Sequence, residues 1–288
     1  MTILNNAVLV ELNISAWTAY KLDKQQSAKV VADNNATESD AARVNKNLMA
    51  GTALLKNIND YIAKVRVWHI AQTLPWAEKG PRLLPMANFF NYKQQLNTME
   101  ANTQALVKTF LDAYPNLVSV AAFKLGNFFN RSEYPDVSEV ARKFSFRYAF
   151  TPVPQSGHFI LDTHNEVIKE LATNYEAEAN RRVSDAMKDA WGRLHETLIH
   201  ISSRMTDSPQ DQEDKKKRYH ESMLTNAHEL CGLLTAFNIT GDAKLEQARQ
   251  DLERALAGVR IDDIKESASV RREIKDKVDN ILAVNDWI

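Results

Sequence analysis

The chain has 288 residues, enough for one large domain or two ordinary ones, and its composition is that of a globular protein, with 44% hydrophobic and 25% charged residues. Glycine and proline are scarce, at eight each, which argues against a β-rich fold and against a glycine-rich phosphate-binding enzyme and favours long helices. No apolar run approaches the roughly 20 residues of a membrane span, and no signal peptide is predicted. Cys231 is the only cysteine, so we expect no internal disulfide and a cytoplasmic protein.

The net charge of −1 is unevenly distributed along the chain. Residues 1–150 carry 17 Lys and Arg against 12 Asp and Glu, a net of +5, whereas residues 151–288 carry 19 against 25, a net of −6. Chance differences of this size are common in helical proteins, and this is the interpretation that we favour. The alternative is a mildly basic first half that faces an anionic partner.

Two segments of the first half are predicted to be strands. Residues 7–14 alternate between apolar and polar positions, and residues 144–151 place Phe144, Phe146, Tyr148 and Phe150 on one face. A period of two is typical of a half-buried strand. Since neither strand buries its apolar face alone, we expect the two to pair in one small sheet covered by helices.

The rest of the first half is predicted to be helical, apart from one loop. Helices are expected at residues 37–73, 89–113, 115–129 and 137–143, the last with Asp136 as its N-cap. Residues 74–88 contain three prolines and a glycine and are predicted to be a loop.

The second half is predicted to be helical throughout. A capping box at residues 163–166 starts a helix that could exceed 40 residues, and the polar residues 207–218 form a turn or loop before the next helix. The simplest arrangement is a helical hairpin followed by two shorter helices. The predicted fold is therefore mainly α (α+β), with a mixed α+β domain at 1–160 that holds a small antiparallel sheet, and a helical bundle or coiled-coil arm at 161–288.

One apolar stripe in the long helix has the spacing of a coiled-coil contact, with steps of 4, 3, 4, 3 and 4 residues. We call it the 187–205 stripe; its members are Met187, Trp191, Leu194, Leu198, Ile201 and Met205. Because the stripe is longer and more regular than one compact core requires, we predict that it binds a partner protein or a second copy of the chain.

A second candidate site combines aromatic and basic residues around the predicted loop. Its members are Trp76, Lys79, Arg82, Phe89, Phe90, Tyr92 and Lys93. Anchoring of the loop on the core is the interpretation that we favour. The alternatives are docking of a partner protein and binding of single-stranded nucleic acid, whose bases stack on aromatic rings while its phosphates pair with cations.

No catalytic, cofactor-binding or metal-binding residues are predicted. His195 and His200 are five residues apart, so they point about 140° apart around a helix and do not chelate one ion. His228 and Cys231 have a spacing that suits a metal pair, but the leucines around Cys231 favour a buried thiol. Glycine-rich nucleotide loops and the nucleophile elbow of hydrolases are both missing from the sequence.

The first 160 residues resemble an uncharacterised family of phage and plasmid proteins. The residues that carry the resemblance are Leu12-Asn13-Ile14-Ser15, Leu83-Leu84-Pro85, Asn88-Phe89-Phe90, Tyr114-Pro115, Leu125-Gly126, Phe128-Phe129, Tyr134-Pro135, Phe144-Ser145-Phe146 and Pro152-Val153-Pro154. Genes of this family tend to neighbour a MoxR-type AAA+ ATPase and a von Willebrand A-type protein. The resemblance implies a mobile-element origin, a bacterial host cytoplasm and a role beside an ATP-driven remodelling machine.

These observations favour a non-enzymatic interaction or scaffold protein of a phage or mobile element. It would form a homo-oligomer or bind a partner protein, such as an AAA+ ATPase, and it would not insert into a membrane. The alternatives are a protein that binds single-stranded nucleic acid through residues 74–93, and an enzyme whose active site assembles only in three dimensions.

Overall fold

The computed structural model describes residues 6–154, 166–206, 219–285 and 287. The fold is mainly α with a small antiparallel sheet, which confirms the predicted fold class. The chain forms two compact units. Unit 1 comprises Met1–Glu11, Ile70–Tyr92 and Ala149–Ile288, and unit 2 comprises Leu12–His69 and Lys93–Tyr148.

This division differs from the predicted boundary near residue 160. Unit 1 joins three segments of the chain, because Leu9, Leu83 and Val153 pack in the same core as Leu194 and Leu198 of the C-terminal half. Unit 2 is built from the two segments that lie between those of unit 1. The division depends on contacts between residues more than 100 positions apart. Local periodicity does not predict such contacts.

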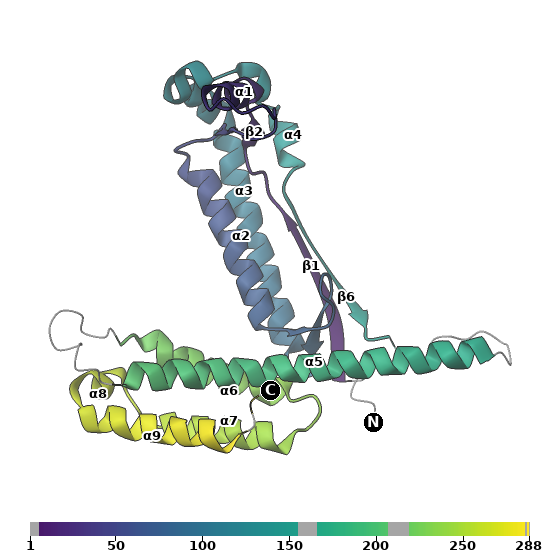
Figure 1. Cartoon of the computed structure of the whole chain (residues 1–288), viewed down its shortest axis with the longest axis vertical. Helices are drawn as coiled ribbons and strands as arrows, with labels where there is room; N and C mark the ends of the chain where they lie inside the picture. The colour runs from purple at the N-terminus through teal and green to yellow at the C-terminus, as the bar shows by residue number, and fades with distance from the viewer. Residues whose placement is uncertain (1–5, 155–165, 207–218, 286, 288) are drawn as a thin grey trace. The chain divides into compact units, whose positions relative to one another are not determined.

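The four-stranded sheet has the order β4-β5-β1-β6. Its strands are β1 (Ala7–Ser15), β4 (Leu74–Pro75), β5 (Arg82–Pro85) and β6 (Ser145–Pro152). The predicted strands at 7–14 and 144–151 are confirmed, and they are neighbours in the sheet (Figure 1). The prediction of a loop at 74–88 was wrong in part, because β5 pairs antiparallel with both β1 and β4 and buries Leu83 and Leu84.

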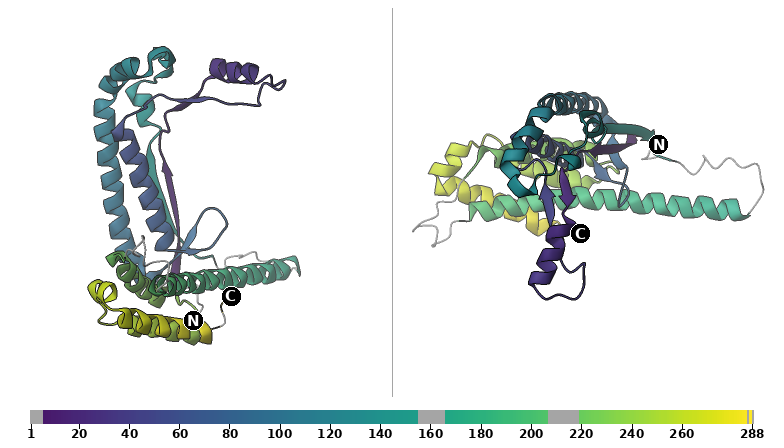
Figure 2. Two further views of the ribbon diagram at one scale, coloured as in Figure 1. Left: turned by 60° about the vertical axis from the view of Figure 1, so that its left-hand side comes forward. Right: turned by 90° about the horizontal axis from the view of Figure 1, so that it is seen from above.

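Unit 2 contains most of two long helices and a small strand pair. Its elements are β2 (Tyr20–Leu22), α1 (Lys24–Asp33), β3 (Asn45–Asn47), α2 (Ala53–Ala71), α3 (Phe89–Leu125) and α4 (Val137–Ala141), with 3₁₀ turns at Gly126–Phe128 and Arg131–Glu133. Within this unit, α1 and its two strands stand away from the α2–α3 pair (Figure 2). The predicted helix at 37–73 begins only at Ala53, because Asn45–Asn47 pair with Tyr20–Leu22 instead.

Helix α3 is continuous where the sequence predicted two helices separated at residue 114. Pro115 lies inside the helix and faces solvent, although a proline removes one helical hydrogen bond and strains the preceding turn. The neighbouring Phe110, Tyr114 and Val118 are buried in the core of unit 2. The hydroxyl of Tyr114 also donates to the carbonyl oxygen of Pro135 at 2.9 Å. Packing of one face of α3 therefore keeps the helix continuous across Pro115.

The helices of unit 1 lie side by side in a bundle (Figure 1). They are α5 (Glu166–Met205), α6 (Glu221–Phe237), α7 (Ala243–Leu256), α8 (Ile261–Glu266) and α9 (Ala268–Val284), and a 3₁₀ turn at Met86–Asn88 precedes α3. Helix α5 packs against α6, α7 and α9. The predicted capping residues 163–165 and the predicted loop 207–218 lie outside the described residues.

All six side chains of the 187–205 stripe are buried in the core of unit 1. Their neighbours in that core come from the other helices of the same chain, including Leu224 and Leu234 of α6, Leu252 of α7 and Val278 of α9. A side chain covered by its own chain offers no surface to a partner. The interpretation of the stripe as a partner-binding site therefore loses its support.

Truncation of one buried stripe residue tests this assignment. Leu198 is fully buried, whereas the next residue, Ile199, is 48% exposed. We expect Leu198→Ala to lower the free energy of unfolding of unit 1 by about 2–5 kcal/mol, because it leaves a cavity in a packed core. Ile199→Ala should change it by less than about 0.5 kcal/mol. Urea denaturation followed by circular dichroism measures both.

Protein concentration distinguishes an intrachain core from an interface. If the stripe packs only within its own chain, the midpoint of the Leu198→Ala transition should be the same at low and high protein concentration. If a second copy covers the stripe, the midpoint of the wild-type transition should rise with concentration and that of Leu198→Ala should rise less.

Candidate interaction surface

The aromatic residues predicted to bind nucleic acid are mostly part of the core. Trp76 and Tyr92 are buried, and the guanidinium of Arg182 lies 5.6 Å from the Trp76 ring. The ring of Phe89 is half-buried and lies 5.0 Å from that of Phe150. Rings held in this way are closed to stacking by nucleic-acid bases. Anchoring on the core, the alternative favoured from the sequence, is what the structure shows for these rings.

The basic residues of the same region do not form one patch with the aromatic rings. The Nε of Arg82 donates a hydrogen bond to the hydroxyl of Thr73 at 2.7 Å. A terminal nitrogen of the same guanidinium donates to the carbonyl oxygen of Thr73 at 3.1 Å. Lys79 and Lys93 are exposed, as is Phe90. Lys93 belongs to unit 2, whereas the other six predicted residues belong to unit 1. Of the seven predicted residues, only Lys79, Phe90 and Lys93 are exposed.

Arg193 of α5 is a half-buried cation that the sequence analysis missed. It donates hydrogen bonds to the carbonyl oxygens of Ala71 at 2.8 Å, Ile70 at 3.1 Å and Thr73 at 2.8 Å. Asp189, one turn earlier, pairs with its Nε at 2.7 Å. Carbonyls at the end of a helix lack intrahelical partners, so Arg193 satisfies them. No local signal reveals this contact, because the carbonyls lie about 120 residues away in the chain.

The histidines do not assemble a metal site among the described residues, where no group of three or more His, Cys, Asp or Glu side chains is placed to hold an ion. His195 stacks on the ring of Trp287 at 4.5 Å. The Nδ1 atom of His228 lies 2.8 Å from the carbonyl oxygen of Leu224. His200 and His220 line an open hollow of about 460 Å³ between α5 and α6. Of these four histidines, only His200 and His220 share one environment.

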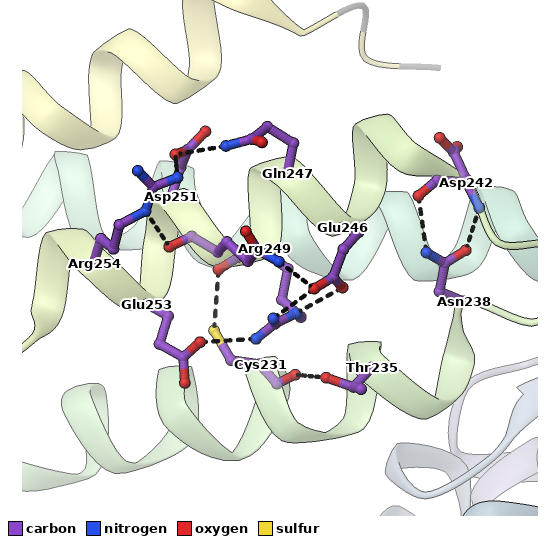
Figure 3. Close-up of polar contacts among 11 residues, drawn as sticks. Cys231, Thr235, Asn238, Asp242, Glu246, Gln247, Arg249, Asp251, Glu253 and Arg254 are labelled. Atoms are coloured by element: carbon purple, nitrogen blue, oxygen red, sulfur yellow. Dashed lines mark hydrogen bonds and ion pairs between the residues drawn. The ribbon is translucent and has the colours of Figure 1, made fainter.

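Cys231 is a buried thiol, as the sequence indicated. It lies on α6 and points its sulfur towards the carbonyl oxygen of Arg249 on α7 at 3.9 Å (Figure 3). Arg249 in turn bonds Glu246 and Glu253. Burial, together with the negative charge of Glu253, raises the pKa of Cys231 to about 11. A thiol with this pKa stays protonated at neutral pH and is a poor nucleophile.

The raised pKa predicts slow reaction of Cys231 with a disulfide reagent. At pH 8 a thiol of pKa about 11 is about 0.1% thiolate, whereas an unperturbed thiol is about a quarter ionised. We expect the folded protein to react with 5,5′-dithiobis(2-nitrobenzoate) at least 100-fold more slowly than the protein unfolded in guanidinium chloride, measured by absorbance. Comparable rates in the two states would contradict the buried, protonated thiol.

An exposed apolar surface lies at the end of unit 2 where α3 terminates. We call it the end surface; its members are Phe123 (89% exposed), Tyr20 (61%), Phe128 (47%) and Leu22 (42%). Tyr20 and Leu22 belong to β2, and Phe123 and Phe128 to the end of α3 and the turn that follows it. Phe123 has the largest exposed fraction of any large apolar side chain among the described residues.

Polar contacts join β3, and the residues before α2, to the end of α3. Lys46, on the strand β3 that pairs with β2, points its ammonium to the carbonyl oxygen of Phe128 at 3.3 Å. It also forms ion pairs with Asp23 and Glu133. Lys124 follows Phe123 in the chain, and its ammonium donates a hydrogen bond to the carbonyl oxygen of Gly51 at 3.4 Å. A hollow of about 530 Å³ is lined by Tyr20, Gly51 and their neighbours.

Comparison with known proteins adds no identification: no family model, no curated protein and no solved structure matches the chain. Among the residues that the structure describes, no helix is long and apolar enough to cross a membrane. The functional argument therefore starts from the surfaces of this molecule.

Proposed function

We propose that the chain is a non-enzymatic interaction protein that binds another protein through the end surface of unit 2. The observation that carries the proposal is the exposure of Phe123, which at 89% is the largest of any large apolar side chain among the described residues. Aromatic rings are enriched at the centres of protein interfaces, where their burial contributes much of the affinity.

The end surface has the properties of an interface more than those of a small-molecule site. Its rings project from secondary structure whose ends are joined by Lys46 and Lys124, so they are held in place before a partner arrives. The neighbouring hollow is lined by polar side chains such as Thr18 and Asn47 together with apolar ones such as Met49 and Leu55. Interfaces combine apolar and polar groups in this way.

Two kinds of partner are proposed. A second copy of the chain would bury the end surface in a homo-oligomer. The resemblance to the phage and plasmid family adds an AAA+ ATPase as a partner to test, which would make this chain a scaffold of a remodelling machine in a bacterial cytoplasm. Single-stranded nucleic acid is the weaker alternative, because Trp76 and Tyr92 are buried and Arg82 is bonded to Thr73.

Site-specific photo-cross-linking tests the end surface. With p-benzoylphenylalanine in place of Phe123, we expect irradiation of producing cells to give a discrete cross-linked product, because the ring is buried in the interface. The control carries the same residue in place of Lys64, an exposed position on α2.

The mass of the product identifies the partner. A product of twice the mass of the chain shows self-association, and any other discrete mass shows a different partner, which mass spectrometry then identifies. A product at position 123 no stronger than that at position 64 would contradict the proposed function.

A further inference from the structure

The strand β6 is an edge strand of the four-stranded sheet, and the outer edge of β6 is open. The order β4-β5-β1-β6 places β1 on one side of β6, and no strand among the described residues pairs with its other side. An open edge presents backbone N–H and C=O groups that another extended chain can pair with. Proteins that bind peptides by adding a strand use this geometry.

An apolar groove lies along the first part of this strand in unit 2. It has a volume of about 370 Å³ and lies between α3 and the start of β6. Val107 and Leu111 of α3 form one wall, and Phe144 and Phe146 form the other. All four side chains are only half-buried, so the groove offers apolar area to an occupant.

The two faces of β6 differ in chemistry. Phe144 and Tyr148 turn to α3: the Phe144 ring lies 5.9 Å from that of Phe110, and the Tyr148 hydroxyl donates to Oδ1 of Asn97 at 2.8 Å. Arg147, which alternates with them, is exposed. Successive side chains of a strand point to opposite faces, so Arg147 lies on the face away from α3.

Three exposed cations lie in β6 or in the turn that precedes it. Arg142 and Lys143, in the turn before the strand, are exposed like Arg147. These three side chains form no ion pair with any described residue. Unit 2 as a whole carries 15 Lys and Arg against 10 Asp and Glu, a net of +5. The surroundings of the edge therefore favour an acidic partner.

We infer that the open edge of β6 binds an extended segment of a partner protein in which apolar and acidic residues alternate. The segment pairs its backbone with β6. Its apolar side chains enter the groove beside Phe146, and its acidic side chains lie on the face of Arg147. Opposite charges on neighbouring strands stabilise their pairing.

Two other occupants fit less well. A second copy of β6 would bring the Arg147 side chains, and the cations before the strand, of two chains together, and like charges on paired strands are destabilising. A helix would fill the groove but leave the backbone groups of the edge without partners. The inference does not depend on the end surface, because 10 residues of α3 separate Asp112, at the end of the groove, from Phe123.

Binding of a designed peptide tests the inference. The probe is a fluorescein-labelled ten-residue peptide that alternates glutamate with valine, and its affinity for the full chain is measured by fluorescence anisotropy. We expect Arg147→Glu to weaken binding at least tenfold, and Val107→Trp, which fills the groove, to do the same. The matched control is Lys29→Glu, the same charge reversal at an exposed position on α1, which should change the affinity less than twofold.

Backbone methylation of the peptide tests strand addition itself. Alternate amides of a strand point to the same side. One peptide is N-methylated on every valine and a second on every glutamate, so in each the methyl groups lie along a single edge. We expect only one of the two to lose binding, because only one set of amides faces β6.

Several outcomes would overturn the inference. The acidic strand is excluded as the occupant if the wild-type protein shows no binding at 1 mM peptide. It is also excluded if the protein binds a lysine–valine peptide equally well. Equal affinity of the two methylated peptides removes strand pairing. A dimer that the Arg147→Glu variant abolishes would assign the edge to a second copy instead.

Discussion

Burial of the 187–205 stripe is the constraint on which unit 1 depends. The stripe packs against α6, α7 and α9, and residues of β1, β4 and β5 join the same core. Removing this apolar area from water is the dominant favourable contribution to the stability of such a bundle. Because α5 contributes to every part of the core, segments from the beginning, middle and end of the chain form one unit.

Arg193 adds a polar link to this apolar core. Its guanidinium donates hydrogen bonds to the carbonyl oxygens of Ile70, Ala71 and Thr73. It also forms an ion pair with Asp189. Burial lowers the pKa of the neighbouring Arg82, and the charge of Arg193 lowers it further. The cluster is thus a structural one, whose donors are already occupied by the protein's own backbone. This is why two half-buried arginines in one region do not indicate an anion-binding site.

The surfaces that we connect with function lie in unit 2, which differs from unit 1 in charge and in what it leaves open. Unit 2 has a net charge of +5, whereas unit 1 has 21 Lys and Arg against 27 Asp and Glu, a net of −6. The end surface presents aromatic rings, and the edge of β6 presents backbone groups beside an apolar groove. These two surfaces suit different partners, because one offers apolar area and the other offers a template for an extended chain.

Local periodicity was sufficient to identify the strands at 7–14 and 144–151 and the long helix with its apolar stripe. The sequence also indicated that Cys231 is a buried thiol and favoured core anchoring for Trp76. What covers the stripe, the continuity of α3 through Pro115 and the pairing of β5 with β1 depend on the folded chain. The physical reason is that periodicity reports which face of an element is buried, whereas the partner of that face is decided by contacts between residues far apart in the chain.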